Sequence, residues 1–226
     1  MSASVHAVVL ARTAEDIVVG DAIVRHRLAS RVMHWAVAFF FLVCLLSGLP
    51  IWTPVFGWMA GLLGGLSVCR VLHPWAGVLY FAASLGMFLN WQREMRLLPK
   101  DREWLGSKVV RYMSFQEQDP EVGKYNGGQK LFFFAVSLAA LGLLASGMVL
   151  WWSTSLSQPL RVAGILIHEV TFILLAMAVV LHIYLGTAAE PGTFRSMTRG
   201  TVSAAWARFH HPRWFREVTN GDAHRS

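Results

Sequence analysis

Four long apolar runs dominate this 226-residue sequence and constrain its fold more than any other feature. They cover residues 32–52, 72–91, 131–152 and 162–185. Each has about the 20 residues that a helix needs to cross roughly 30 Å of hydrocarbon. Because lipid offers no hydrogen-bond partner to backbone groups, each run is expected to be helical. The sequence therefore predicts an all-α fold, an integral membrane four-helix bundle with four transmembrane helices.

The composition agrees with a membrane protein. Charged residues make up only 15% of the chain and hydrophobic residues 55%, whereas a soluble domain carries about 25% charged residues. The net charge of +7 would suit nucleic acid, but the basic residues are not interleaved with base-stacking aromatics, so no nucleic-acid partner is expected. A fifth apolar stretch, 55–68, is too short to span and is expected to lie in the interface or to form a re-entrant cap.

The distribution of lysine and arginine predicts the orientation in the membrane. Eighteen of the twenty lie in three places: before the first run, between the second and third runs, and after the fourth. Only Arg70 and Arg161 lie on the other side. Cytoplasmic loops are enriched in these residues, so both termini are expected on the cytoplasmic side of a bacterial inner membrane, in contact with membrane lipid.

This topology predicts three segments. They are a cytoplasmic N-terminal arm (1–30), a transmembrane domain (31–187, with a cytoplasmic loop at about 92–130) and a basic cytoplasmic tail (188–226). Within the tail, residues 206–217 alternate basic and aromatic side chains. Such a segment could lie on anionic lipid or on a partner chain, and lipid is the simpler interpretation.

Four histidines lie inside the apolar runs, where an imidazole is costly and usually functional. One such histidine alone could equally form a hydrogen bond between helices. Here, however, the four sort by depth: His34 and His182 lie near the cytoplasmic ends of their runs, and His73 and His168 near the outer ends. His168 and His182 share one helix face within about 40°, roughly 21 Å apart along the axis. The pattern predicts two stacked pairs.

Two facing imidazoles suit a haem better than a zinc ion. Zinc would need four ligands including Cys or carboxylate, and only Glu169 lies beside one of these histidines. A haem in a helical bundle needs only two axial imidazoles, and no C-x-x-C-H motif indicates covalent attachment. We therefore predict two b haems, with His73 and His168 ligating the outer iron and His34 and His182 the inner iron.

Small and basic residues near these histidines fit the same interpretation without requiring it. Glycines in three of the runs would leave room for a flat ring, although close helix packing explains them equally well. They are Gly48, Gly77, Gly86, Gly142 and Gly147. Arg31 and Arg70 each precede a histidine by three residues. Each could pair with a haem propionate or simply anchor the helix at the interface.

The most specific motif is the string Lys-Tyr-Asn-Gly-Gly-Gln-Lys at 124–130. Taken with Arg-Val-Leu-His-Pro at 70–74, Met-His-Trp at 33–35 and His-His-Pro-Arg-Trp at 210–214, it resembles the cytochrome b (gamma) subunit of membrane-bound formate dehydrogenases. The likeness runs from about residue 24 to 218. It implies four transmembrane helices, two b haems and axial ligands at the same four histidines.

The resemblance also implies a quinone pocket beside the inner haem, formed by Asn126, Gly128 and Gln129. The two amides would donate to a quinone carbonyl, and the glycine would let the backbone N–H approach. On the residues alone, a turn leading into a helix is the simpler interpretation. The quinone could be menaquinone or ubiquinone.

The implied partners are an iron–sulfur beta subunit and a molybdenum or tungsten alpha subunit, in a heterotrimer that could assemble further. The chain would carry electrons from the periplasmic iron–sulfur subunit across the membrane to reduce quinone near the cytoplasmic side. It has no formate-oxidising site of its own. The alternatives are a diheme cytochrome b of a nickel–iron hydrogenase or another periplasmic oxidoreductase and, more distantly, a haem-free anchor or transporter.

Overall fold

The computed structural model describes residues 3–99, 101 and 120–221. Four of the eight basic residues between the second and third apolar runs (Lys100, Arg102, Lys108 and Arg111), and Arg225 in the tail, lie outside this described part. The chain forms two compact units. We call Met33–Leu89 with Ala135–Val179 the bundle unit. Met1–Val32, Asn90–Phe134 and Val180–Ser226 form the terminal unit.

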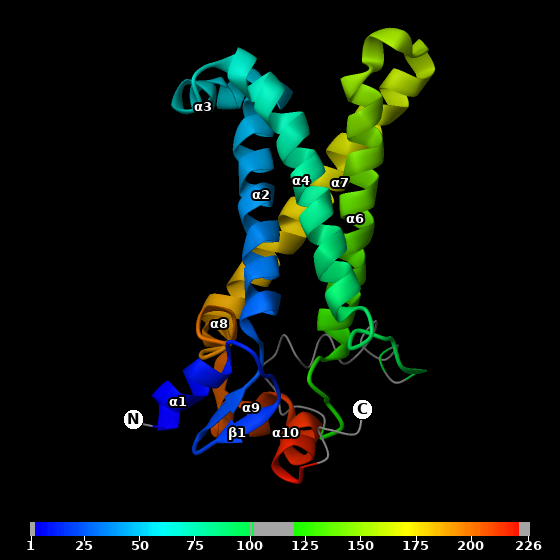
Figure 1. Cartoon of the computed structure of the whole chain (residues 1–226). Helices are drawn as coiled ribbons and strands as arrows, with labels where there is room; N and C mark the ends of the chain where they lie inside the picture. Colours follow the sequence, from blue (N-terminus) through cyan, green and yellow to red (C-terminus); the bar gives the residue numbers. More distant parts are fainter. Residues whose placement is uncertain (1–2, 100, 102–119, 222–226) are drawn as a thin grey trace. The chain divides into compact units, whose positions relative to one another are not determined.

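Four helices are long and apolar enough to cross a membrane, as predicted (Figure 1). They are α2 (Leu28–Trp52), α4 (Leu66–Trp91), α6 (Gly127–Trp151) and α7 (Gln158–Tyr184), the last continued by a π-helical turn, Leu185–Ala189. Each begins several residues before its apolar run. The apolar runs therefore omitted the first four to six residues of each helix.

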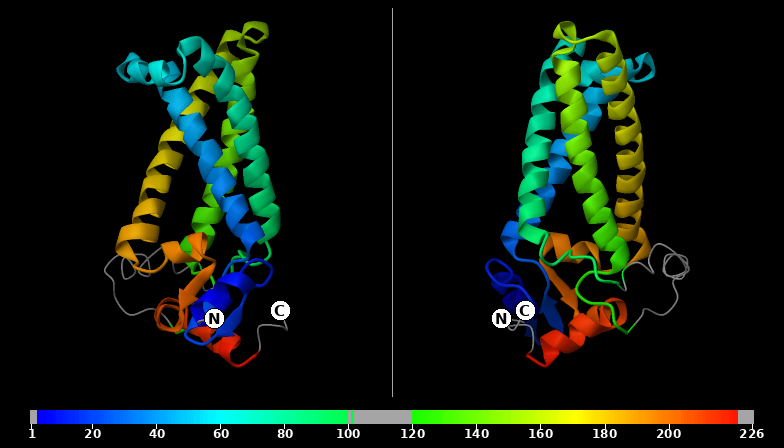
Figure 2. Two further views of the ribbon diagram at one scale, coloured as in Figure 1. Left: turned by 60° about the vertical axis from the view of Figure 1, so that its left-hand side comes forward. Right: turned by 90° about the vertical axis from the view of Figure 1, so that its right-hand side faces the viewer.

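Figure 2 shows the helices of the bundle unit from two sides. Aromatic contacts join these helices. Phe41 of α2 meets Tyr80 of α4 with ring centroids 6.1 Å apart, and Trp75 of α4 meets Trp151 of α6 at 5.2 Å. Large apolar side chains also point outward: Leu138 is 71% exposed and Leu174 62%. Such a surface suits contact with lipid tails rather than water.

The short apolar stretch after α2 forms two small helical elements and does not span. They are η1 (Pro54–Phe56) and α3 (Gly57–Leu62). Gly64 and Gly65 then adopt positive φ angles of 91° and 106°, which turn the chain into α4. Between α6 and α7 the connection is a single turn, η3 (Ser153–Ser155).

The terminal unit contains a small antiparallel sheet that the sequence did not predict. Its strands are β1 (Ile17–Val19), β2 (Ala22–Val24) and β3 (Thr201–Ser203), in the order β1-β2-β3. In the register of β2 and β3, Ile23 pairs with Val202, so the N-terminal arm and the tail share one sheet. The unit also includes α1 (Ala3–Leu10), α8 (Phe194–Thr198), α9 (Ala204–His210) and α10 (Pro212–Thr219) (Figure 1).

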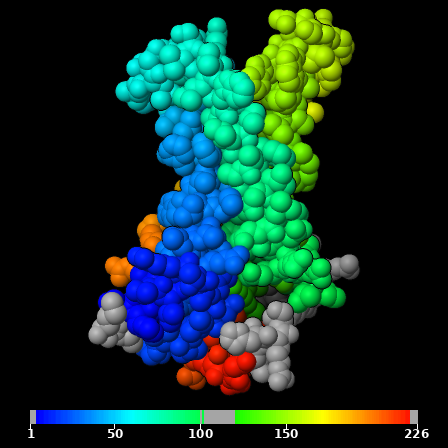
Figure 3. All heavy atoms as spheres, in the orientation of Figure 1, coloured from blue at the N-terminus to red at the C-terminus, as the bar shows by residue number. Residues whose placement is uncertain are grey.

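The aromatic side chains of the tail point into this unit. Trp206 is 9% and Trp214 3% exposed, and both belong to a core cluster with Ile23 and Val202. The expectation that most of the tail lies on lipid does not account for these buried rings. The N-terminal residues of the unit form a closely packed group in the space-filling view (Figure 3).

Candidate functional site

Within the bundle unit, α4 and α7 bring His73 and His168 together. Their ring centroids are 6.1 Å apart and their planes differ by 72°. Two imidazoles bound to opposite sides of one metal need about this separation, since a metal–imidazole bond is roughly 2 Å long. The structure thus brings together the two residues that the sequence assigned to the outer iron.

Hydrogen bonds fix the His73 ring through Nδ1. This nitrogen lies 3.1 Å from the carbonyl oxygen of Cys44 and 3.3 Å from Oγ of Ser47. The Ser47 hydroxyl donates to the Val43 carbonyl at 2.6 Å, so its oxygen is left to accept. Nδ1 therefore carries the proton, and Nε2 keeps the lone pair that a metal requires.

His168 is held in the same way by a serine on another helix. Its Nδ1 lies 2.9 Å from Oγ of Ser146 on α6. The Ser146 hydroxyl donates to the Gly142 carbonyl at 2.6 Å, so it accepts from Nδ1–H and leaves Nε2 as the ligand atom. With these tautomers, His73 and His168 would hold a haem iron through their Nε2 atoms.

Sequence reasoning missed both serines. Ser47 is completely buried and Ser146 is 4% exposed. The signal that could have found them is a hydroxyl inside an apolar run, directly before a glycine considered for haem clearance (Gly48 and Gly147). Polar side chains at such depths commonly bond between helices.

Three glycines leave space around the two imidazoles. A Cβ at Gly48 would lie 2.7 Å from Cε1 of His73, and one at Gly147 would lie 3.4 Å from Cε1 of His168. A Cβ at Gly77, one turn after His73, would meet no atom within 4 Å. Gly48 thus permits the close approach of His73, and Gly77 leaves room on the ligand face of α4.

The two histidines predicted for the inner iron belong to different units. His34, in the bundle unit, packs edge-on against Trp35 at 5.4 Å. His182, in the terminal unit, stacks on Phe132 with centroids 4.7 Å apart and planes 6° apart. The pairing of His34 with His182 stays a prediction.

Asn126 and Gln129 form a reciprocal cap at the start of α6. The Gln129 backbone N–H donates to Oδ1 of Asn126 at 2.8 Å, and the Asn126 N–H donates to Oε1 of Gln129 at 3.0 Å. Both amide oxygens are used in the cap, and the NH₂ groups take no part in it. Gly128 lies between them in the first turn. The cap and a quinone site are therefore compatible.

An ion cluster precedes this cap in the terminal unit. Nζ of Lys124 lies 2.8 Å from Glu15, 3.2 Å from Asp16 and 3.3 Å from Glu94. Burial alone would raise the pKa of Glu15, but Lys124 and the neighbouring hydrogen bonds lower it below its ordinary value. Burial raises the pKa of Glu94, and Glu15 and Asp16 add to that rise while Lys124 opposes it.

The segment that leads to the cap is held by both ends of the chain. Arg25 donates to the Lys124 carbonyl at 2.6 Å, and its guanidinium lies over the rings of Trp206 and Trp214 at 4.8 and 5.2 Å. Nδ1 of His211 donates to the Gly123 carbonyl at 2.7 Å. The N-terminal arm and the tail together therefore hold the backbone at residues 123 and 124.

Arg31 and Arg70 differ in their surroundings. The Arg31 guanidinium donates to the backbone carbonyls of Thr198 and Ala11 at 2.9 and 3.3 Å. The sequence analysis did not predict these bonds, which connect the start of α2 to the tail and to the N-terminal arm. Arg70 is exposed, one turn before His73.

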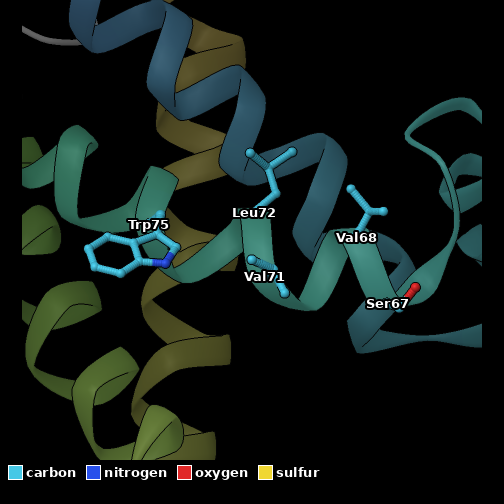
Figure 4. Close-up of a pocket in the computed structure, with 5 residues that line it drawn as sticks. All are labelled: Ser67, Val68, Val71, Leu72 and Trp75. Atoms are coloured by element: carbon cyan, nitrogen blue, oxygen red, sulfur yellow. The ribbon is translucent and has the colours of Figure 1, made fainter.

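A shallow apolar hollow on α4 lies away from the His73 side of that helix. Its lining residues are Ser67, Val68, Val71, Leu72 and Trp75 (Figure 4). Val71 and Trp75 are 65% and 59% exposed and, by helix geometry, lie on the face opposite His73. This hollow has the character of a lipid-facing surface.

Comparison with known proteins gives consistent matches. The family model described as prokaryotic cytochrome b561 matches residues 25–200. The chain is 34% identical over 201 residues to the formate dehydrogenase cytochrome b556(fdo) subunit of Escherichia coli (strain K12), covering 88% of this chain and 94% of that one. It is 32% identical to the nitrate-inducible b556(Fdn) subunit of the same strain (89% and 94% covered) and 31% to the cytochrome b556 subunit of Haemophilus influenzae (86% and 83%).

Proposed function

Since the chain belongs to the prokaryotic cytochrome b561 family, as a multi-pass membrane cytochrome b subunit of formate dehydrogenase, we propose that it connects formate oxidation on the outer side of the membrane to quinone reduction near the cytoplasmic side. The chain works in a complex with other formate dehydrogenase subunits and holds haem b. We assign two haems to it. When bound, haem iron supplies reversible one-electron transfer.

The observation that carries this proposal is the His73–His168 pair. Both Nδ1 atoms are held by acceptors from neighbouring helices, at 3.1 and 2.9 Å. These bonds orient the two Nε2 atoms as ligands for the outer iron and keep the imidazoles neutral donors toward the metal. We assign His34 and His182 to the inner iron because both lie near the cytoplasmic ends of their apolar runs, at a different depth from the outer pair.

The quinone site is proposed at Asn126, Gly128 and Gln129. The cap leaves the NH₂ groups of Asn126 and Gln129 as donors for a quinone carbonyl. It also places them on a rigid helix start, which favours a site whose donors are already positioned. The resemblance of the 124–130 string to the cytochrome b subunit of membrane-bound formate dehydrogenases also supports this assignment. The quinone is proposed to be menaquinone or ubiquinone.

The orientation follows from charge. Eighteen of twenty Lys and Arg residues fall on the side of the two termini, which supports placing that side in the cytoplasm of a bacterial inner membrane. The outer iron would then lie nearest an iron–sulfur beta subunit, itself joined to a molybdenum or tungsten alpha subunit. Protons for quinol would be taken from the cytoplasm.

Vesicles that contain the assembled complex can test this proposal. Formate should reduce the b-type absorption bands, and a soluble naphthoquinone or ubiquinone analogue should reoxidise them. A complex whose bands respond to formate but are never reoxidised by either quinone class would exclude quinone reduction by this chain. Bands that hydrogen reduces and formate does not would favour the alternative, a cytochrome b subunit of a nickel–iron hydrogenase.

A further inference from the structure

In the sequence, Tyr125 lies between the ion cluster and the cap of α6, two features of the terminal unit that the proposed function does not connect. It follows Lys124, the centre of the ion cluster, and precedes Asn126, the cap residue assigned to quinone. Its ring stacks against His26 with centroids 6.1 Å apart, and the Arg25 guanidinium lies 5.7 Å from the ring centre. This inference rests on the proposed quinone site.

The Tyr125 hydroxyl is buried and has no hydrogen-bond partner among the residues that the structure describes. Burying a hydroxyl without a partner is unfavourable, and such groups in native proteins usually have a specific reason. A phenol can donate and accept at once. It is therefore equipped to pass a proton between two groups that are not in contact.

The ion cluster provides a route from solvent toward this hydroxyl. The side chain of Glu94 is 40% exposed, whereas that of Lys124 is 12% exposed. Lys124, Glu94, Arg25 and Glu15 all act electrostatically on Tyr125, and burial raises its pKa, so the phenol stays protonated at neutral pH. Burial also raises the pKa of Glu94, which makes this carboxyl a readier proton acceptor from water than an ordinary glutamate.

We propose that Tyr125 passes protons from Glu94, at the solvent end of the ion cluster, to the quinone bound at Asn126 and Gln129. Formate supplies the two electrons. At one quinone oxygen an O–H bond forms as the Tyr125 O–H breaks, and the phenol oxygen takes a proton from Glu94 through bridging water. Glu94 is reprotonated from solvent. The second quinone oxygen takes its proton from water, so one quinol forms and Tyr125 is unchanged.

Lys124 has a positioning role in this route. Burial alone would lower its pKa, but Tyr125, Asp16, Glu94 and Glu15 raise it, so the ammonium keeps its charge. It holds the three carboxylates within 2.8–3.3 Å and supplies no proton itself. Glu94, the most exposed of the three acids, is left to exchange protons with water.

The test uses the complete complex in vesicles, with formate and a soluble naphthoquinone. In Tyr125→Phe the ring stays and the hydroxyl is lost. We expect kcat for quinone reduction to fall at least tenfold with KM little changed, while haem content and formate reduction of the haem bands stay normal. The solvent deuterium isotope effect on the remaining rate should increase. Tyr184→Phe, which alters an exposed tyrosine at the end of α7, is the matched control and should keep the original rate.

A second variant keeps the test decisive if Tyr125→Phe assembles poorly. The rate of the original complex should fall as pH rises through the raised pKa of Glu94, and Glu94→Gln should lower the rate below that pH and remove this dependence. Normal kcat and an unchanged pH profile in either assembled variant would overturn the proposal, as would a change in KM alone. Failure of the original complex to reduce quinone would instead refute the proposed function.

Discussion

At the scale of single residues, the two outer histidines depend on the groups that hydrogen-bond to their Nδ1 atoms. His73 and His168 were found from their depth in the apolar runs, because ionisable side chains are rare there. Their partners Ser47 and Ser146 were not, because a serine in a membrane helix is common and often bonds only to its own helix. Both serines do bond to their own helix, and that bond leaves each oxygen to accept from a histidine.

Removing the Ser146 hydroxyl should raise the midpoint potential of the outer haem. The hydrogen bond gives His168 more anionic character, which favours ferric iron. A bond worth about 0.5–1.5 kcal/mol corresponds to roughly 20–60 mV for one electron. Potentiometric titration of Ser146→Ala should show this rise with haem content retained. Ser84→Ala, a buried serine elsewhere in the bundle unit, should leave the outer potential in place, and equal shifts in both variants would refute the assignment.

Gly48→Ala should remove the outer haem. The new methyl carbon would lie 2.7 Å from Cε1 of His73, closer than packed atoms can lie, so the imidazole must move from its ligand position. Haem quantitation should fall by about one haem per chain. Gly61→Ala in α3, where a Cβ meets nothing within 4 Å, should keep full haem. Retention of both haems in Gly48→Ala would show that His73 tolerates displacement.

At the scale of elements, sequence patterns located the helices but not their ends or the sheet. The hydrophobic runs gave all four helices, because crossing lipid requires length and apolarity together. The run beginning at residue 131 missed the first turn of α6, where Gly127 and Gly128 weaken the helical signal and the Asn126–Gln129 cap replaces it. The three strands were missed because β2 pairs with β3, nearly 180 residues away, and each strand has only three residues.

Two substitutions at Asn126 separate helix capping from quinone binding. Asn126→Ala removes the cap acceptor and should destabilise the start of α6 by about 1 kcal/mol. Asn126→Asp keeps an oxygen for the Gln129 N–H but loses the NH₂ donor. If this NH₂ binds quinone, both variants should reduce quinone at least tenfold more slowly at a fixed quinone concentration. Steady-state rates at several quinone concentrations measure this. A normal rate in Asn126→Asp would restrict Asn126 to capping.

The contact between the tail and residues 123–126 should weaken in mild acid. Burial and the nearby Arg25 charge lower the pKa of His211 well below its ordinary value. A group whose pKa is depressed by folding contributes stability above its unfolded pKa, about 6.5, and loses it as the pH falls toward the folded pKa. Hydrogen-exchange protection factors at 122–126, which correct for the slower intrinsic exchange in acid, should therefore fall between pH 7 and pH 5. His211→Asn keeps a donor for Gly123 and does not titrate, so an identical acid response in that variant would contradict the argument.

At the scale of the whole molecule, the chain combines lipid-facing helices with a folded terminal unit. Composition and charge indicated the lipid-facing helices, because apolar length and Lys/Arg asymmetry can be counted directly in the sequence. They could not indicate the folded terminal unit. Arg25 lies more than 180 residues before Trp206 and Trp214 in the sequence. Only the folded unit places its guanidinium over both rings. The ion cluster around Lys124 could not be predicted for the same reason, because Glu15 and Asp16 are distant in sequence from Glu94.

The predicted orientation can be measured by labelling. A cysteine introduced at His6 should react with a membrane-impermeant maleimide only after the vesicle is opened, whereas one at Arg161 should react from the periplasmic side. The native Cys69 is buried, and Cys44 lies within α2, so their background reaction should be low. Labelling of position 6 from the periplasmic side would reverse the orientation and place the proposed quinone pocket on the outer face.

The most direct test of the account is haem stoichiometry in single histidine variants of the assembled complex, by reduced-minus-oxidised spectra with quantitation of extracted haem. The original chain should carry two b haems. His73→Ala and His168→Ala should each remove the same one, and His34→Ala and His182→Ala should each remove the other. One haem in the original chain, or loss of the same haem from all four variants, would contradict the two paired sites.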